Sequence, residues 1–150
     1  MQRWLLIVGA ALFLFLGIGM PTAYNLYKQS RPHPVWFPIP LNPEAPLGQT
    51  DGIIRELTTK LGERENLMRI GKDLDLKNKW GMDSDDEVAD EISSRFFVKR
   101  GDMDTPMGKV PSIHVGLRGT NRDREISYAL LDALLPDVWK VLGIEPPKKP

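Results

Sequence analysis

The feature that most constrains this chain is an apolar run near its start, Trp4–Met20, which reads WLLIVGAALFLFLGIGM and carries no charged side chain. As a helix, these 17 residues would be roughly 25 Å long, close to the lower limit for crossing a bilayer. Trp4 at one end, and Tyr24 and Tyr27 beyond the other, are placed like interfacial aromatic belts. We therefore predict a transmembrane anchor over residues 1–27.

A cleaved signal peptide and a buried core helix are the alternatives to an anchor. A signal peptide has a basic start and small residues before its cleavage site. Here the start offers only Arg3 and the amino group, and the best cleavage position, after Ala23, has Pro21 where a small residue is expected. We therefore favour an uncleaved single-pass anchor. The short segment before it favours a cytoplasmic amino terminus and an extracytoplasmic domain, although the basic residues on the two sides are nearly balanced.

Residues 28–48 are predicted to form a proline-rich strap. Its prolines fix φ and lack an N–H donor, which excludes a helix or a central strand: Pro32, Pro34, Pro38, Pro40, Pro43 and Pro46. We expect polyproline II conformation, at about 3.1 Å per residue. The strap also carries large apolar side chains that a spacer in water would not need: Val35, Trp36, Phe37 and Ile39. These are expected to contact the lipid interface, a partner or the chain's own domain.

The overall composition excludes several classes of protein. Twenty basic side chains balance 20 acidic ones, and there is no Cys. A disulfide scaffold, a Cys-based zinc site and a thiol nucleophile are therefore ruled out. A chain without net charge also lacks the basic surface of a general nucleic-acid binder. We predict no nucleic-acid partner, no cofactor and no metal site.

Residues 49–145 have the composition of a small globular domain, followed by a tail, 146–150. Apolar residues at helical spacing predict helices over Gly52–Leu61 and Glu63–Ile70, with Gly71 as the stop of the second. Ser84 with Glu87 is a capping box that opens another helix, ending near Ser94. A last helix follows Thr120 and Asp123, and Pro136 is expected to break it or to begin a second one.

Two segments of the domain are predicted to be strands. Strict alternation of apolar and polar residues over Val110–Arg118 indicates a half-buried strand, and Phe96, Phe97 and Val98 are β-prone. We expect the two to pair as a hairpin over a loop from Lys99 to Lys109. The predicted fold class is therefore α+β: a single transmembrane helix, then a small, mainly helical domain with a β-hairpin.

Few residues suggest chemistry. His114, on the polar face of its strand, is the best catalytic candidate, and a hydrolase would pair it with Asp102, Asp104 or Asp123. The acidic run from Asp83 to Glu91 is interpreted as a helix start that complements the helix dipole. A weak anion site is predicted where cations surround a helix N-terminus: Arg118, Thr120, Arg122 and Arg124.

The leading functional hypothesis is a non-catalytic accessory or assembly subunit of an integral membrane protein complex, held in the bilayer by its anchor. Large aromatic side chains dominate interface energetics, so we expect partner contacts at Trp36, Phe37 and Trp139, with Val35 and Ile39. The alternatives are a membrane-anchored extracytoplasmic hydrolase that uses His114, and a module that binds anionic polymer or lipid headgroups of the cell envelope.

Overall fold

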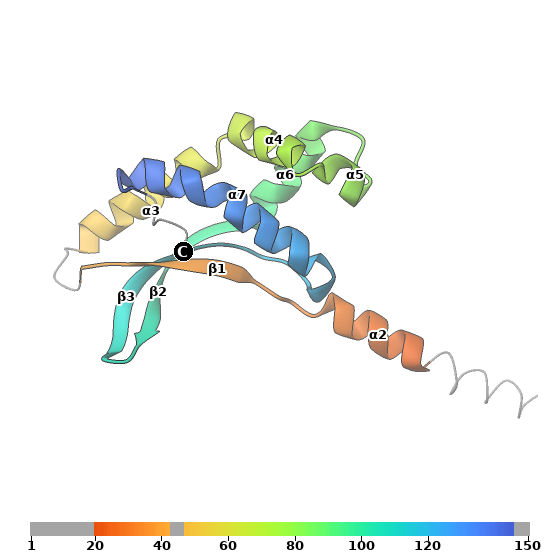
Figure 1. The fold of residues 1–150 in the computed structure, drawn as a ribbon, viewed down its shortest axis with the longest axis horizontal. Coiled ribbons are helices and arrows are strands. Elements are labelled where there is room, and N and C mark those ends of the chain that lie inside the picture. Colours follow the sequence, from red (N-terminus) through yellow and green to blue (C-terminus); the bar gives the residue numbers. More distant parts are fainter. Residues whose placement is uncertain (1–19, 43–46, 146–150) are drawn as a thin grey trace, which may run out of the picture.

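The computed structural model describes residues 20–42 and 47–145 (Figure 1). Most of the predicted anchor, residues 1–19, lies outside the described residues, as does the tail 146–150. Within the described ranges, no helix is both long and apolar enough to cross a bilayer. The described chain combines helices with one small sheet, which confirms the predicted α+β class.

One three-stranded antiparallel sheet, in the order β1-β3-β2, organises the domain. Its strands are β1 (Val35–Pro40), β2 (Phe96–Thr105) and β3 (Gly108–Leu117). The pairing of β1 with β3 runs from Val35 opposite Leu117 to Pro40 opposite Ser112. The expectation of polyproline II conformation is therefore wrong for Val35–Pro40, which forms an edge strand.

The spacing of the prolines explains how this segment joins a sheet. On either side of β1, the N–H groups of His33 and Leu41 donate to Gly119 O and Pro111 O, at 2.7 and 2.9 Å. Alternate residues of a strand point their N–H groups the same way, so odd-numbered positions face β3. Pro34, Pro38 and Pro40 stand at even positions, where the missing donor would point outward. Proline is tolerated in a sheet on such an edge.

The predicted hairpin is confirmed, but its loop is much shorter than expected. β2 and β3 stay paired from Phe96 opposite Leu117 to Thr105 opposite Gly108. Only Pro106 and Met107 lie between the strands, so most of the expected loop from Lys99 to Lys109 is strand. The turn closes at Gly108, whose φ of 120° favours glycine, and Thr105 Oγ1 donates to Gly108 O at 2.7 Å.

Helices lie against one face of the sheet (Figure 1). They are α3 (Leu47–Leu61), α4 (Arg64–Asp73), α5 (Leu76–Trp80), α6 (Asp85–Arg95) and α7 (Arg124–Leu142), the last preceded by a short 3₁₀ helix, η2 (Asn121–Asp123). A further helix, α2 (Met20–Ser30), projects away from the body. The most extensive helix–helix packing joins elements that are not consecutive: α4 packs on α6, and α3 packs on α7.

Several predicted helix boundaries need correction. Gly71 does not end its helix, since α4 continues to Asp73. This buried position holds a glycine because a Cβ there would lie 2.7 Å from Val88 Cγ1 of α6. Pro136 neither breaks α7 nor starts a new helix, because α7 runs from Arg124 to Leu142 with the proline inside it. The buried side chains on either side of that proline hold the helix in place.

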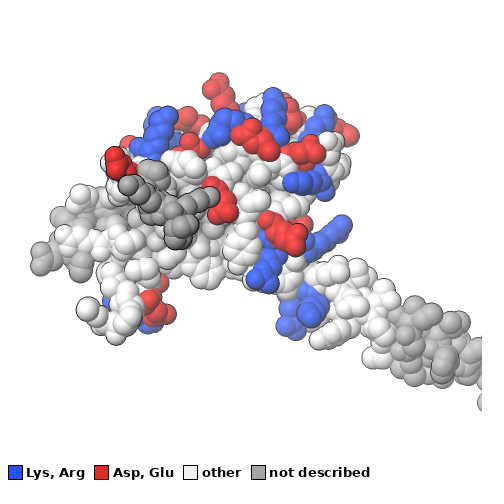
Figure 2. Space-filling view, in the orientation of Figure 1, with Lys and Arg blue, Asp and Glu red and all other residues white. Residues whose placement is uncertain are grey.

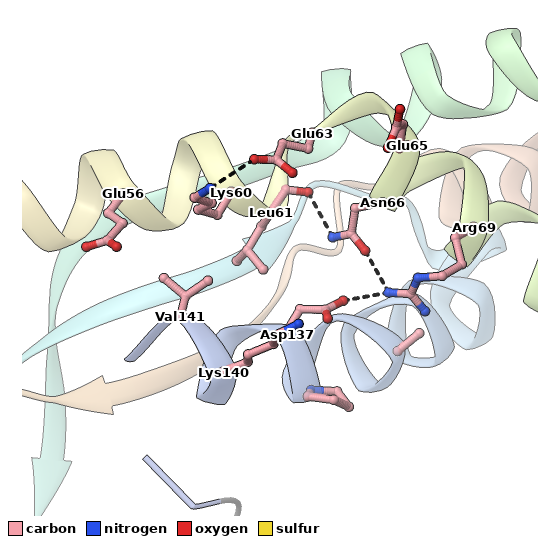
Figure 3. A pocket seen from close by; sticks show the side chains of 12 residues that line it. Glu56, Lys60, Leu61, Glu63, Glu65, Asn66, Arg69, Asp137, Lys140 and Val141 are labelled. Atoms are coloured by element: carbon pink, nitrogen blue, oxygen red, sulfur yellow. Dashed lines mark hydrogen bonds and ion pairs between the residues drawn. The ribbon is translucent and has the colours of Figure 1, made fainter. Parts of the chain in front are cut away.

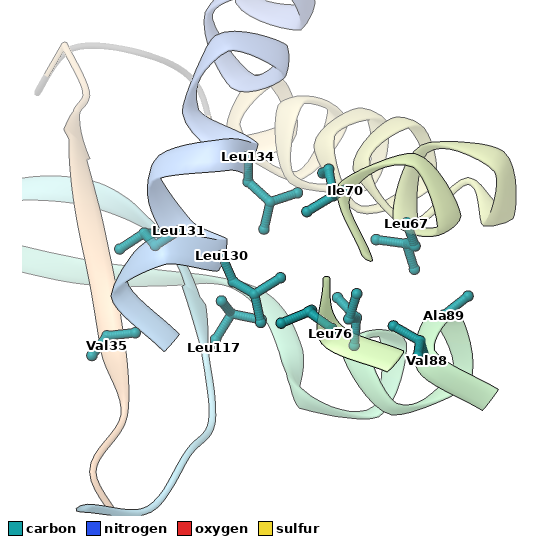
Figure 4. Close-up of a cluster of buried hydrophobic side chains, with 11 residues drawn as sticks. Val35, Leu67, Ile70, Leu76, Val88, Ala89, Leu117, Leu130, Leu131 and Leu134 are labelled. Carbon is teal, nitrogen blue, oxygen red and sulfur yellow. The ribbon is translucent and has the colours of Figure 1, made fainter. Parts of the chain in front are cut away.

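The core consists of two neighbouring clusters of buried side chains. The first joins α4, α5, α6 and α7 to one end of the sheet (Figure 4), and includes Val35 of β1, Leu117 of β3 and Leu130 of α7. The second lies between α3, α7 and the other end of the sheet, and includes Ile39 of β1. Strand β1 thus contributes a buried side chain to each cluster.

The capping box at the start of α6 is confirmed. Ser84 Oγ accepts from the N–H of Glu87 at 3.2 Å, and Glu87 Oε2 accepts from the N–H of Asp83 at 3.0 Å. We expect Ser84→Ala to lower the free energy of unfolding by about 1 kcal/mol, since it removes the acceptor of one orphan N–H group. Urea denaturation measures this loss. Ser94→Ala, near the end of the same helix, is the control and should cost less.

Candidate functional site

The face of the sheet opposite the helices carries a group of aromatic side chains. Trp36, Phe97, Lys99 and His114 share this face, as the register requires. The rings of Trp36 and His114 are stacked, with centroids 5.9 Å apart and planes inclined by 14°. Lys99 Nζ lies 5.2 Å from the centroid of the Phe97 ring. We call Trp36, Phe97 and His114 the aromatic face.

Two glycines make room for these rings. A Cβ at Gly101 would lie 2.6 Å from His114 Nε2, and a Cβ at Gly116 would lie 2.7 Å from Phe97 Cζ. The His114 ring therefore occupies the space above Gly101, and the tip of the Phe97 ring reaches the space above Gly116. An aromatic surface of this kind suits contact with another molecule, and Trp36 remains 49% exposed in the domain.

The structure does not bring the predicted hydrolase residues together. Asp102 and Asp104 lie on the opposite face of the sheet from His114. Side chains alternate between the two faces along a strand, and Lys99 and Gly101 hold the positions of β2 on the His114 side. Asp123 lies at the start of α7, where it binds Arg95 and Thr120. His114 Nε2 is enclosed without a hydrogen-bond partner among the described residues. The structure therefore places none of the three predicted carboxylates beside the imidazole.

The predicted partner-contact residues fall into two groups. Val35 and Ile39 are only 3% and 6% exposed and belong to the core. Phe37 and Trp139 pack edge to face, with ring centroids 5.4 Å apart, between β1 and α7. In the folded domain these four side chains therefore contact the chain's own helices, which was one of the expectations for the strap. Among the predicted partner-contact residues, Trp36 is the one whose side chain belongs to the aromatic face.

The predicted anion site already contains a carboxylate. Thr120 Oγ1 donates to Asp123 Oδ2 at 3.2 Å, and Arg95 Nη1 lies 3.3 Å from the same oxygen. The guanidinium of Arg124 lies 5.7 Å from the centroid of the Tyr128 ring. Arg118 and Arg122 are exposed. The four predicted residues therefore do not converge on one empty anion position, and the arginines spread around the start of α7.

The acidic run that begins at Asp83 has a structural role. Arg64 of α4 reaches Asp86 and Asp90 of α6, at 2.8 and 2.7 Å, and Lys72 reaches Asp85 at 3.2 Å. Hydrogen bonds from Arg64, first to Asp90 and then to Asp86, raise the pKa of its guanidinium above the ordinary value. These pairs join α4 to α6 across the surface.

A wide cavity of about 850 Å³ lies between α3, α4 and α7 (Figure 3). Its rim mixes acidic and basic side chains, and Arg69 spans it by donating to Asn66 and to Asp137, at 2.6 and 2.7 Å. Asn66 in turn donates to Leu61 O at 3.4 Å. Lys60 and Glu63 on the rim pair as well, at 3.4 Å, whereas Glu56, Glu65 and Lys140 form no ion pair among the described residues.

Metal binding and resemblance give no further indication of function. Across residues 20–42 and 47–145, no group of three or more His, Cys, Asp or Glu side chains could hold a metal ion. Comparison of the chain with protein-family models, with curated proteins and with solved structures gives no match.

Proposed function

We propose that this chain is a single-pass membrane protein that serves as a non-catalytic accessory or assembly subunit of a larger membrane protein complex. The anchor is the apolar amino-terminal segment. The partner is an integral membrane protein complex that contacts the domain at the aromatic face. The domain is proposed to lie on the extracytoplasmic side.

The observation that carries the proposal is helix α2. It has no buried residue, and its large apolar side chains are exposed by 56–65%: Met20, Tyr24, Leu26 and Tyr27. A helix that buries none of its apolar side chains gains little stability from packing, so α2 needs support from something outside the domain. Because the apolar run Trp4–Met20 leads directly into it, a bilayer around that run would supply the support.

The sheet offers the partner one face more readily than its β1 edge or its other face. The outer edge of β1 carries prolines where donors would be needed, which blocks the addition of another strand there. The helix-covered face is filled by the two core clusters. Trp36 is left as a large aromatic side chain at the surface, of the kind that anchors protein interfaces.

Loss of Trp36 should release the protein from its complex. We expect Trp36→Ala to reduce co-purification from native membranes in mild detergent by about tenfold or more, since a central aromatic anchor contributes about 2 kcal/mol or more. The measurement is the amount of partner recovered with the tagged full-length chain. The double variant Trp36→Ala/Phe37→Ala would be ambiguous, because Phe37 packs against Trp139 inside the domain.

Tyr128→Ala is the matched control, because Tyr128 is an aromatic side chain of similar exposure, 46%, on α7. It should leave co-purification at the wild-type level. Recovery of the same partners with Trp36→Ala as with the wild type would refute the aromatic face as the contact surface. A wild-type chain that is monomeric and brings down nothing would refute the subunit assignment itself.

A further inference from the structure

A groove of about 810 Å³ lies where α2 joins the domain. Leu26, Tyr27, Gln29 and Ser30 of α2 form one wall. The opposite wall comes from α5 and the segment after it, from Arg95 and from the start of α7: Lys79, Trp80, Met82, Arg95, Thr120, Arg122, Asp123 and Ile126. The junction is fixed by Asn121, whose side-chain and backbone N–H groups donate to Lys28 O and Arg31 O, at 3.0 and 3.1 Å.

Two cations that line the groove have no acidic partner. Elsewhere on the domain some cations are paired with carboxylates, as Arg64, Arg69 and Arg100 show. Within the described part of the chain, Lys79 and Arg122 have no ion-pair partner. Lys and Arg side chains gather where α2 meets the body of the molecule (Figure 2).

The groove holds one acidic side chain, and its charge is already offset. Asp123 is bound by Arg95 at 3.3 Å, and Arg95 also binds Glu91 at 2.6 Å. The guanidinium of Arg95 lies 4.8 Å from the centroid of the Trp80 ring, which fixes it further. The two unpaired cations, Lys79 and Arg122, therefore remain available to an external anion.

The position of the groove along α2 identifies the anion. Under the proposed anchor, a helix starting at Trp4 crosses a hydrocarbon core of about 30 Å in about 20 residues, and so reaches the headgroup layer near Tyr24. That layer is about 5–8 Å thick, equal to about three to five further residues. The α2 wall of the groove, Leu26–Ser30, lies at this depth. Tyr27 and Trp80 are also residues enriched at membrane interfaces.

We infer that this groove binds the phosphate-bearing headgroup of an anionic phospholipid in the bilayer that holds the anchor. Lys79 and Arg122 bind the phosphate, and Leu26, Met82 and Ile126 contact the adjoining apolar part of the lipid. The inference rests on the proposed membrane anchor and adds a ligand to it. The bound lipid would fix the angle between α2 and the domain, and so orient the aromatic face relative to the membrane.

Hydrogen exchange in lipid nanodiscs tests the inference with the full-length protein. The discs contain either phosphatidylcholine alone or phosphatidylcholine with about 30% phosphatidylglycerol. In the anionic discs, amides of residues 26–30 and 119–126 should exchange about fivefold more slowly, the effect of about one well-placed cation near a charged bilayer. The difference should shrink at about 0.5 M salt, which screens the charges.

Two variants of equal charge make the result specific. Lys79→Gln/Arg122→Gln should abolish the difference between the two discs, whereas Lys109→Gln/Lys140→Gln, outside the groove, should keep it. Equal exchange of the wild type in both discs would overturn the headgroup site while leaving the anchor intact. Protection by millimolar inorganic phosphate in neutral discs would assign the groove to a soluble anion instead. Failure to insert into any disc would refute the anchor and the headgroup site together.

Discussion

Replacement of Ile39 by Ala is expected to lower the domain's free energy of unfolding by about 2–5 kcal/mol, the usual cost of truncating a buried Ile. Ile39 lies between two prolines in the segment for which the sequence predicts a polyproline II strap. In the structure it is 6% exposed and packs with Leu57, Ile113 and Val138 under α3 and α7. Urea denaturation of the full-length chain, followed by circular dichroism, measures the loss.

Trp36→Ala is the matched control for this prediction. Trp36 is the larger side chain, but it is 49% exposed on the aromatic face, so its truncation should cost clearly less than that of Ile39. A spacer would give the opposite order or no effect from either variant. Equal stability of Ile39→Ala and the wild type would therefore show that β1 is not part of the folded domain.

The elements that could be predicted from sequence are those specified by local chemistry. The alternation of Ile113, Val115 and Leu117 predicted strand β3, because a half-buried strand requires it. Ser84 and Glu87 predicted the start of α6, because a capping box satisfies backbone donors within four residues. Both signals arise within one element, so tertiary contacts were not needed to recognise them.

The proline-rich segment was misassigned because the rule against proline in strands applies to central strands. The signal that could have identified an edge strand is the alternation along the segment: prolines stand at even-numbered positions, Pro34, Pro38 and Pro40, and apolar residues at odd-numbered positions, Val35, Phe37 and Ile39. One set lacks donors on the outer edge, and the other points apolar side chains inward. That pattern becomes meaningful only once a partner strand is known, and β3 lies more than 70 residues away.

Helix ends at Gly71 and Pro136 were mispredicted because packing outweighs local propensity there. Gly71 is needed inside α4, where Val88 leaves no space for a side chain. Pro136 lies in a helix held by buried Leu134 and Val138. The groove beside α2 was also missed, except for Thr120 and Arg122. Its other walls come from segments that are distant in sequence, so no local pattern marks it.

The second large effect is expected in the anchor. Leu12→Arg/Leu14→Arg places two cations in the middle of the apolar run, and each costs about 2.5–3.5 kcal/mol in membrane insertion. We therefore expect this variant to lose stable membrane association. Leu12→Ile/Leu14→Ile, which keeps the run apolar, should insert like the wild type.

Alkaline carbonate extraction of native membranes, followed by intact mass measurement of the chain, tests the central claim most directly. The wild type and the isoleucine variant should stay in the membrane pellet with the first 23 residues still attached, and the arginine variant should appear in the supernatant. A wild-type chain that begins after Ala23 and is released by carbonate would contradict the anchor, and the subunit and lipid proposals would fall with it.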